Sequence, residues 1–532
     1  DFAGGVECVN ELEDSGRVKR SLVRRPVAIA VTVAVALVIS ACVPLAFLGQ
    51  GERGADSPSS LPAEPGDSVA SFAAQEPDWQ SCLDGMQCAD VYAPLDWTDP
   101  AGERITLHLV KQPATGGDPI GTLFVNPGGP GASGADYVAE NIDSAVQSDV
   151  ARAYDVIGWD PRGVGQSAPV SCLDAAAMDE YLFGLDDTGE VGSDEWIAAA
   201  RAESKEFGAA CAESSGALLE HVDTGSTVQD LDMLRGIVGD AKLNYLGYSY
   251  GTYIGARYAD AYPEKVGRLV LDGAMDPSAS LSEVVREQTR GFELALRAYV
   301  TDCIERNNCP FTGDVDQSMA AIGTLLDRIE VTPLQGSDGR MLTSSTMLTA
   351  IITPLYSQSN WGYLDQLFET AAEGDADVAL SLADFYYDRS NGEYLSNSTE
   401  AFAAINCLDY PNADDVEQMR AEAAELAEIA PTIGRFQGFG DLSCSGWPYP
   451  GVDERVAVSA EGADPILVVG TTGDPATPYR WAVSLAKQLD NASLLTYKGE
   501  GHTAYGENDC VNAAVDGYLL DGVVPKNGTT CT

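Results

Sequence analysis

The chain has 532 residues, of which 45% are hydrophobic, and this is ample for a large folded core. Its formal net charge of −50 at pH 7 argues against nucleic acid as a partner, because nothing would neutralise the phosphates. The charge favours a heavily solvated surface and would also attract cationic peptides.

Residues 1–41 are predicted to be an upstream segment and a signal peptide. Basic side chains precede an apolar run at residues 26–41, which is the order found in an export signal. These basic residues are Arg17, Lys19, Arg20, Arg24 and Arg25. Residues 39–42, Ile-Ser-Ala-Cys, resemble a bacterial lipobox, and this resemblance implies cleavage before Cys42 and a diacylglyceryl group on that cysteine.

An uncleaved membrane helix is the alternative, because residues 26–49 are apolar over a length that can span a bilayer. In both cases the positive residues stay in the cytoplasm and the bulk of the chain lies outside. We therefore expect an exported protein of the cell envelope, anchored to the outer face of the plasma membrane by two acyl chains or secreted after release. Residues 42–76 are the predicted lipid anchor and flexible tether, since residues 51–76 are rich in Pro, Ser, Gly, Ala and acids.

Residues 77–278 are predicted to form the first part of an α/β core. A strand-like run at residues 122–125 ends in the glycine-rich segment 126–131, Asn-Pro-Gly-Gly-Pro-Gly. Glycines at this place let backbone amides approach a developing negative charge, so we expect Gly128 or Gly129 to donate to an oxyanion. A phosphate cradle is the alternative, but the segment lacks the Lys-Ser/Thr ending of a phosphate-binding loop.

Residues 247–251 read Gly-Tyr-Ser-Tyr-Gly, between a strand-like run and a helix-like run. This is the nucleophile elbow in its required strand–turn–helix setting, and it predicts Ser249 as a catalytic nucleophile. A side chain at either flanking glycine would clash with neighbouring backbone. The backbone N–H of Tyr250 is the second expected oxyanion donor.

Residues 279–456 are predicted to form a helical cap domain over the active site. Apolar residues recur with helical spacing at residues 284–300, 319–329 and 363–387. Ser249 and the candidate acid Asp474 are 225 residues apart, far more than two or three βα units need, so an insertion must fill the gap.

Residues 457–532 are predicted to return to the core and to complete a triad. An elbow serine needs an acid and then a histidine later in the chain. His502 is the only one of the three histidines that follows Ser249. The buried-strand pattern of residues 466–470 runs into a turn that contains Asp474, which would hold the imidazole tautomer and stabilise the imidazolium.

Several segments carry a family resemblance. Residues 126–131 resemble the H-G-G-P-G loop of prolyl iminopeptidases, with Asn-Pro where that family has His. Residues 159–167 look like the D-x-R-G-x-G-x-S segment of α/β-hydrolases, and residues 271–277 and 406–409 look like segments of secreted tripeptidyl aminopeptidases of actinobacteria. The chain over residues 76–532 also resembles the mycobacterial cell-envelope serine protease lipoproteins of that branch.

The resemblance implies an α/β-hydrolase fold with a mostly parallel central sheet, helices on both faces and a large, mainly helical cap. It also implies a serine exopeptidase that cuts peptide substrates near free N-termini through an acyl-enzyme, without a cofactor. A carboxylic-ester hydrolase or a broader serine protease would use the same triad and stays open. A noncatalytic envelope-binding lipoprotein is a further alternative.

An aminopeptidase must also recognise a free α-ammonium, which a carboxylate near the cleft does through a charge-assisted hydrogen bond. Asp272 is one candidate, because it ends a strand at the face where the site of such a sheet should lie. Asp409 is the other, mainly from the family resemblance. A capping or turn aspartate is the alternative for each.

Of the 12 cysteines, setting aside Cys8 and Cys42 leaves ten, an even number that predicts five disulfides in an exported chain. We expect nearest-neighbour pairing, although other pairings remain open. The pairs would be Cys82 with Cys88, Cys172 with Cys211, Cys303 with Cys309, Cys407 with Cys444, and Cys510 with Cys531. A zinc site is disfavoured, because there is no C-x-x-C spacing and histidines are scarce. No metal is expected.

Overall fold

The structure is a computed structural model, and it describes residues 61–532 except 84, 186–188, 308, 412–413 and 453. The predicted signal peptide, the lipid-bearing Cys42 and most of the tether lie outside the described residues. Among the described residues, no helix has both the length and the apolar character needed to cross a membrane.

A mixed sheet organises residues 77–278 and 457–532, and ten strands of the described residues belong to it. Their order is β1-β2-β3-β5-β4-β6-β7-β12-β13-β14. In chain order they are β1 (Gln80–Ser81), β2 (Gln87–Pro94), β3 (Arg104–Gln112), β4 (Thr122–Asn126), β5 (Asp155–Trp159), β6 (Leu243–Tyr248), β7 (Val266–Asp272), β12 (Ile466–Gly473), β13 (Ala492–Glu500) and β14 (Thr529–Cys531). The pairs from β1 to β5 are antiparallel, and those from β5 onward along the sheet are parallel. The fold is therefore that of an α/β-hydrolase, as the elbow predicts.

Successive apolar side chains of the parallel strands point to opposite faces of the sheet, so both faces are apolar and are covered by helices. In β4, Leu123 and Val125 pack with one buried cluster, whereas Phe124 packs with the other. The first face carries α2 (Gly134–Ala145), α3 (Ser148–Ala153) and α16 (Asp509–Asp521). The second face carries α6 (Thr224–Ile237), α7 (Tyr250–Ala261) and α15 (Tyr479–Gln488). The short helix α1 (Val69–Phe72) packs near β2.

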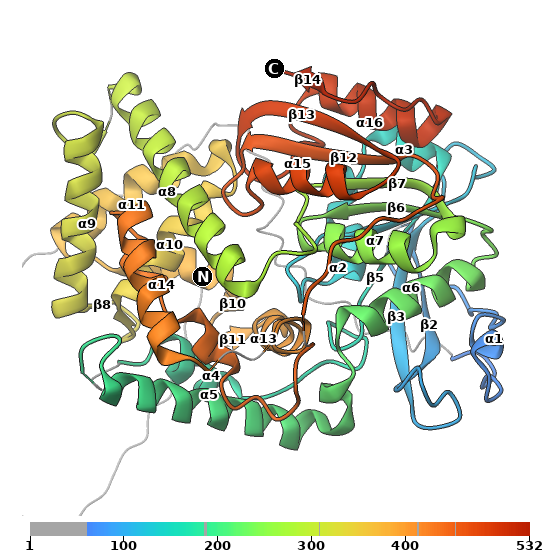
Figure 1. Cartoon of the computed structure of the whole chain (residues 1–532), viewed down its shortest axis with the longest axis horizontal. Helices are drawn as coiled ribbons and strands as arrows, with labels where there is room; N and C mark the ends of the chain where they lie inside the picture. Colours follow the sequence, from blue (N-terminus) through green and yellow to red (C-terminus); the bar gives the residue numbers. More distant parts are fainter. Residues whose placement is uncertain (1–60, 84, 186–188, 308, 412–413, 453) are drawn as a thin grey trace, which may run out of the picture. The chain divides into compact units, whose positions relative to one another are not determined.

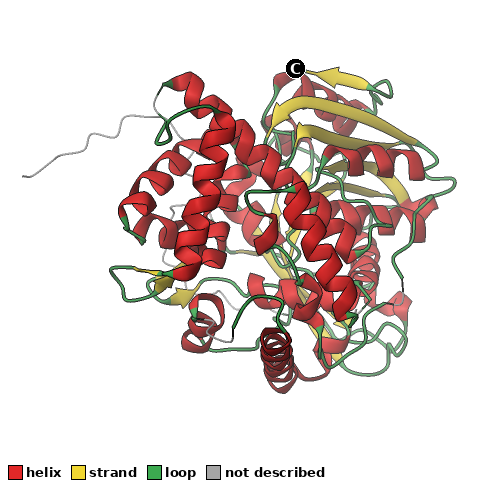
Figure 2. Ribbon diagram, turned by 60° about the vertical axis from the view of Figure 1, so that its left-hand side comes forward, coloured by secondary structure: helices red, strands yellow, loops and turns green. Residues whose placement is uncertain are grey.

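A helical region follows β7 and precedes β12, within the predicted cap range. Its helices are α8 (Leu281–Arg306), α9 (Val315–Val331), α10 (Ser344–Leu355), α11 (Trp361–Glu373), α12 (Asp377–Tyr386), α13 (Ser398–Asp409) and α14 (Val416–Ile429). Two hairpins, β8 (Leu334–Gln335) with β9 (Met341–Leu342) and β10 (Arg389–Ser390) with β11 (Glu393–Tyr394), complete it. The cap has its own buried cluster, which includes Tyr299, Ile322 and Phe368. Figure 1 shows α8, α9, α10, α11 and α14 to the left of the sheet, and Figure 2 shows the same separation of helices from strands.

The cap also uses a segment from the first part of the core. Helices α4 (Ala175–Phe183) and α5 (Asp194–Ser215) lie between β5 and α6 in the chain. Phe183 belongs to the buried cluster of the cap, and Ile197 packs with Met419 and Leu442. Figure 1 shows α4 and α5 beneath α13 and α14. The predicted division at residue 278 therefore assigns α4 and α5 to the core range, although they pack with the cap.

Five short 3₁₀ helices join these elements in the described part of the chain. They are η1 (Gly216–Glu220), η2 (Pro263–Lys265), η3 (Gln358–Asn360), η4 (Gly434–Phe436) and η5 (Gly440–Cys444).

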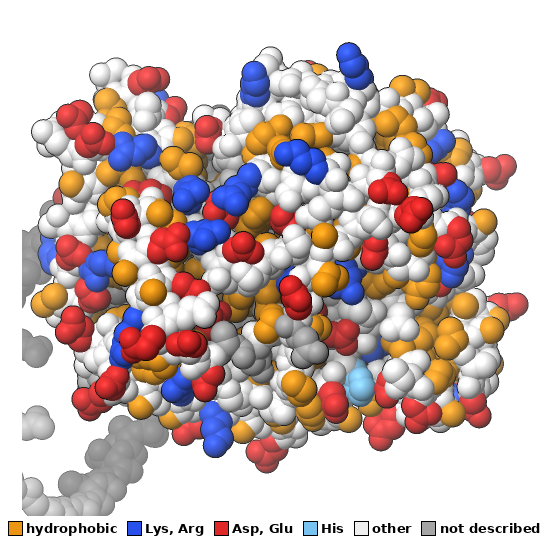
Figure 3. Space-filling model, in the orientation of Figure 1, with side chains coloured by type: hydrophobic (Ala, Val, Ile, Leu, Met, Phe, Trp, Pro, Cys, Tyr) orange, Lys and Arg blue, Asp and Glu red, His pale blue; other side chains and the backbone are white. Residues whose placement is uncertain are grey.

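Five disulfides cross-link the described residues, in the nearest-neighbour pairs expected from the sequence. They are Cys82–Cys88, Cys172–Cys211, Cys303–Cys309, Cys407–Cys444 and Cys510–Cys531. Acidic side chains are spread over the face in Figure 3, as expected for an excess of Asp and Glu over Lys and Arg.

Candidate active site

Ser249 lies on the turn between β6 and α7 with φ 54° and ψ −124°, a backbone conformation that is strained for a residue with a side chain. A Cβ on Gly247 would lie 2.5 Å from the carbonyl oxygen of Gly251, and one on Gly251 would lie 2.7 Å from that of Asn126. Only glycine fits both positions, so the turn holds Ser249 out at the carboxyl end of the sheet.

Asp474 and His502 come from the ends of neighbouring strands, β12 and β13. His502 Nδ1 lies 2.9 Å and 3.0 Å from the two carboxylate oxygens of Asp474. Asp474 is 4% exposed and also accepts from the N–H groups of Ala476, Thr477 and Thr503. Burial lowers the pKa of His502, but the carboxylates of Asp474 and Asp272 outweigh this effect and the net shift of its pKa is upward.

Two further side chains touch this pair, and sequence reasoning missed both. Thr477 Oγ1 donates to Asp474 Oδ2 over 2.9 Å and lies 3.2 Å from His502 Nδ1. Tyr356, which follows α10 in the cap, accepts from the backbone N–H of His502 over 2.8 Å, and its ring packs edge-on against the imidazole. The position of Thr477, three residues after a turn aspartate, is the only local signal for either residue.

The glycine-rich loop after β4 runs against the elbow. A Cβ on Gly128 would lie 2.9 Å from the Cβ of Ser249 and 3.0 Å from the backbone nitrogen of Tyr250. The N–H of Gly128 donates to Asn126 Oδ1 over 3.0 Å, which leaves Gly129 as the candidate donor of this loop. Together with the Tyr250 N–H at the start of α7, it would face a developing oxyanion.

The cap rests directly on the same loop. A Cβ on Gly131 would lie 2.6 Å from the carbonyl oxygen of Ser398 and 3.3 Å from the Cβ of Ala401, both in α13. The loop and this helix are therefore in van der Waals contact with no room for a methyl group.

Asp272, predicted as a substrate-amine ligand, is fully buried. One of its carboxylate oxygens accepts from the N–H groups of Ala504 and Tyr505, at 3.0 Å and 2.8 Å. Burial raises its pKa to about 6. The carboxylate is thus directed at the loop that carries His502, and it does not reach the surface around Ser249.

Asp409, the other predicted amine ligand, is 4% exposed. It accepts from the N–H and the hydroxyl of Thr224, the first residue of α6, and this hydroxyl also contacts the hydroxyl of Tyr250. Burial raises the pKa of Asp409 to about 6 as well. Its placement matches the alternative role of a capping aspartate, and the geometry does not support a direct contact with a substrate amine.

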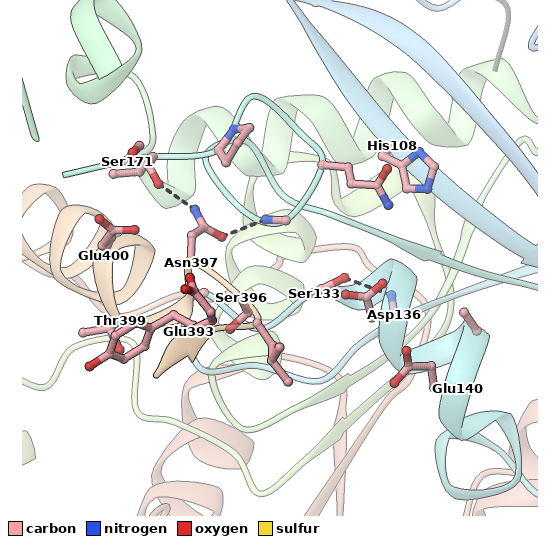
Figure 4. A pocket seen from close by; sticks show the side chains of 18 of the residues that line it. His108, Ser133, Asp136, Glu140, Ser171, Glu393, Ser396, Asn397, Thr399 and Glu400 are labelled. Atoms are coloured by element: carbon pink, nitrogen blue, oxygen red, sulfur yellow. Dashed lines mark hydrogen bonds between the residues drawn. The ribbon is translucent and has the colours of Figure 1, made fainter. Parts of the chain in front are cut away.

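A cavity of about 840 Å³ adjoins the glycine-rich loop at Gly131. Figure 4 shows Asp136 and Glu140 of α2 on one wall and Glu393 and Ser396 on the opposite wall. Gly131 lines this cavity, whereas Ser249, Asp474 and His502 do not. The reacting groups therefore lie outside the cavity.

A serine on a strained turn, together with an imidazole that is paired with a buried carboxylate, provides the groups for acyl transfer, the chemistry of serine hydrolases. Comparison with known proteins agrees with this class: the family described as TAP-like protein matches residues 430–531. The chain is also 37% identical to serine protease Hip1 of Mycobacterium tuberculosis over 84% of this chain and 87% of that protein. The chain belongs to the TAP-like family of α/β-hydrolases.

Two other relatives differ in their described activity. Carboxylesterase B of Mycobacterium tuberculosis is 35% identical over 87% of this chain and 91% of that protein. The tripeptidyl aminopeptidase of Streptomyces lividans is 30% identical over 85% of this chain and 86% of that protein. The family thus includes both peptidases and esterases.

Proposed function

We propose that this serine hydrolase is an exopeptidase that releases short peptides from free N-termini. Two contacts of the cap support the proposal: Tyr356 packs on His502, and α13 lies against the glycine-rich loop. A cap over the site favours cleavage near a chain end, because a substrate cut at an internal bond must fit the chain on both sides of that bond beneath the cap. The relatives described as a serine protease and a tripeptidyl aminopeptidase support a peptide substrate.

The mechanism uses the groups described above. His502 takes the proton of Ser249 as its hydroxyl attacks the peptide carbonyl, and Asp474 stabilises the imidazolium that forms. The N–H groups of Tyr250 and Gly129 hold the oxyanion. His502 then protonates the leaving amine, and water attacks the acyl-enzyme with His502 again acting as the base.

Hydrolysis of carboxylic esters is the second candidate, and the relative described as carboxylesterase B favours it. The same triad serves both reactions, so substrates must separate them. We would compare a tripeptidyl nitroanilide with a short-chain acyl nitrophenyl ester, using kcat/KM for each. Efficient turnover of the ester alone would contradict the peptidase proposal.

Blocking the substrate amine tests the exopeptidase character. Acetylation removes the positive charge of the N-terminus and leaves any carboxylate that binds it unpaired. This should lower kcat/KM by a factor of tens to thousands, roughly 2–5 kcal/mol. Equal cleavage of free and acetylated peptides would instead identify a broader serine protease.

We also propose that the protein is exported and anchored through a lipid on Cys42. The five disulfides of the described residues support an oxidising compartment. Mass spectrometry of the mature N-terminus and detergent partitioning of wild type and Cys42→Ala test the anchor. An unmodified N-terminus at or after Gly51 would contradict it.

A further inference from the structure

We propose that Asp272 is a positioning residue of the active site, which ties the nucleophile turn to the His502 loop and places a second carboxylate near the imidazole. This inference rests on the proposed triad of Ser249, His502 and Asp474, and it gives Asp272 a role other than amine recognition.

The position of Asp272 in the sheet brings it next to all three triad segments. It ends β7, which lies between β6, the strand of the nucleophile, and β12, the strand of the acid. In register it pairs with Tyr248 on one side and with Val469 on the other. Its own carbonyl oxygen accepts from the backbone N–H of Ser249 over 3.0 Å. The main chain of Asp272 therefore helps to fix the elbow.

The next residue brings the same strand end against the imidazole. Gly273 has φ 65°, and a Cβ there would lie 3.2 Å from His502 Cε1 and 3.0 Å from Thr477 Oγ1. Its N–H donates to the carbonyl oxygen of Val469 over 3.2 Å. A displacement of the end of β7 would thus reach His502 directly.

The side chain of Asp272 holds the other side of the site. One oxygen accepts from two successive N–H groups, those of Ala504 and Tyr505. The His502 loop needs such external support, because Thr503 has φ 69°, a conformation that a β-branched residue rarely adopts. The N–H of Thr503 in turn donates to Asp474. Two carboxylates on neighbouring strands therefore hold the loop just after the catalytic histidine.

The second carboxylate oxygen of Asp272 differs from the first in its surroundings. Oδ1 is buried and has no hydrogen-bond partner among the described residues. A buried carboxylate normally has its oxygens satisfied, because burying an unpaired one costs free energy. An asparagine at this position would bury an NH2 group there with two unsatisfied donors, so an amide would not avoid the cost. We infer that the negative charge itself is used.

The charge of Asp272 acts on His502. The carboxylates of Asp474 and Asp272 both raise the pKa of the imidazole, and burial, with a smaller contribution from the charge of Asp474, raises the pKa of Asp272. Burial keeps the surrounding tyrosines neutral by raising their pKa values, so the nearby charges are carboxylates. The titratable groups that face the two residues are Asp474, Tyr137, Tyr248, Tyr356, Tyr505 and, beyond Tyr505, Asp516. An ionised Asp272 would therefore help to stabilise the imidazolium formed during acyl transfer.

Asp272→Asn separates charge from support, because an amide oxygen can still accept from Ala504 and Tyr505. Asp272→Ala removes both. Glu400→Gln is the matched control, since Glu400 is also buried and one of its oxygens accepts from two successive N–H groups, those of Cys172 and Leu173. That carboxylate lies in α13, outside the triad.

The measurement is the rate of Ser249 labelling by a fluorophosphonate as a function of pH, with urea unfolding of each variant. For Asp272→Asn we expect the acidic limb of the profile to move to lower pH by roughly 0.5–1 unit, because a charge that favours imidazolium is lost. Asp272→Ala should in addition lose about a hundredfold in the plateau rate, as a misplaced histidine does. Glu400→Gln should leave the acidic limb where it is.

An unchanged acidic limb in a folded Asp272→Asn protein would overturn the inference, as would the same displacement in Glu400→Gln. Failure of the proposed function looks different, because the wild-type protein would then not be labelled at Ser249 at all. Labelled wild type with an unchanged Asp272→Asn profile would leave the triad in place and remove only the role of Asp272.

Discussion

The backbone N–H of His502 donates to the carbonyl oxygen of Tyr356 over 2.8 Å, so the residue that closes a cap helix also holds the catalytic histidine. The ring of Tyr356 packs edge-on against the imidazole at 5.4 Å between centroids. The cap therefore contributes to the geometry of the triad as well as to its cover.

Replacement of Tyr356 by alanine should lower kcat by roughly tenfold, because the imidazole loses the packing that limits its rotation. Tyr356→Phe keeps the ring and should stay close to wild type. Steady-state hydrolysis of an activated ester gives kcat for both variants. Equal rates for Tyr356→Ala and wild type would show that the ring does not orient His502.

Ser249→Ala should abolish hydrolysis and fluorophosphonate labelling while the fold remains intact, with a loss on the order of a millionfold in kcat. Circular dichroism and urea unfolding check the fold. Ser381→Ala, a change at an exposed serine of α12, is the control and should retain full activity. Near-normal turnover by Ser249→Ala would refute the triad.

Asp474→Asn should reduce kcat by about ten-thousandfold, because the amide would hold the imidazole in the wrong tautomer. The pH–rate profile and kcat are the measurements. A loss of less than tenfold would mean that another group orients His502.

Thr477→Val removes the hydroxyl that donates to Asp474 while keeping the branched shape. We expect kcat to fall by about tenfold, since one hydrogen bond to a charged group contributes roughly 1.5–3 kcal/mol and part of it acts on the triad. Thr477→Ser keeps the donor and serves as the control. Equal activity of the valine and serine variants would contradict this role.

Asp409→Asn should change how stability depends on pH. Burial raises the pKa of Asp409 from 3.8 to about 6, so the folded protein binds this proton more tightly than the unfolded chain. Its contribution to stability is fully present below the unfolded pKa and is lost as pH rises through about 6. The free energy of unfolding of wild type relative to Asp409→Asn should therefore fall across this window in urea titrations. A constant difference would show that Asp409 has an unshifted pKa.

Local sequence was enough to place Ser249, because the elbow depends on two glycines within two residues of it. Chain order then led to Asp474 and His502, which the structure places 2.9 Å apart. The roles of Asp272 and Asp409 depend on what packs over them, and burial of this kind is not encoded nearby in the chain. The contribution of α4 and α5 to the cap was hidden for the same reason, since Phe183 packs with residues from Phe292 onward and Ile197 packs with Met419 and Leu442.

The contact of Gly131 with α13 has a mechanical consequence. The first turn of helix α13 lies in contact with the loop expected to stabilise the oxyanion. Near its other end the helix carries Cys407, which forms a disulfide with Cys444. Removing this bridge alone, by Cys407→Ser with Cys444→Ser, would loosen the helix and leave the disulfides on β2 and β14 intact. Turnover should then decline while the core is still folded, so the oxidation state of a remote cysteine pair would set the catalytic competence of the enzyme.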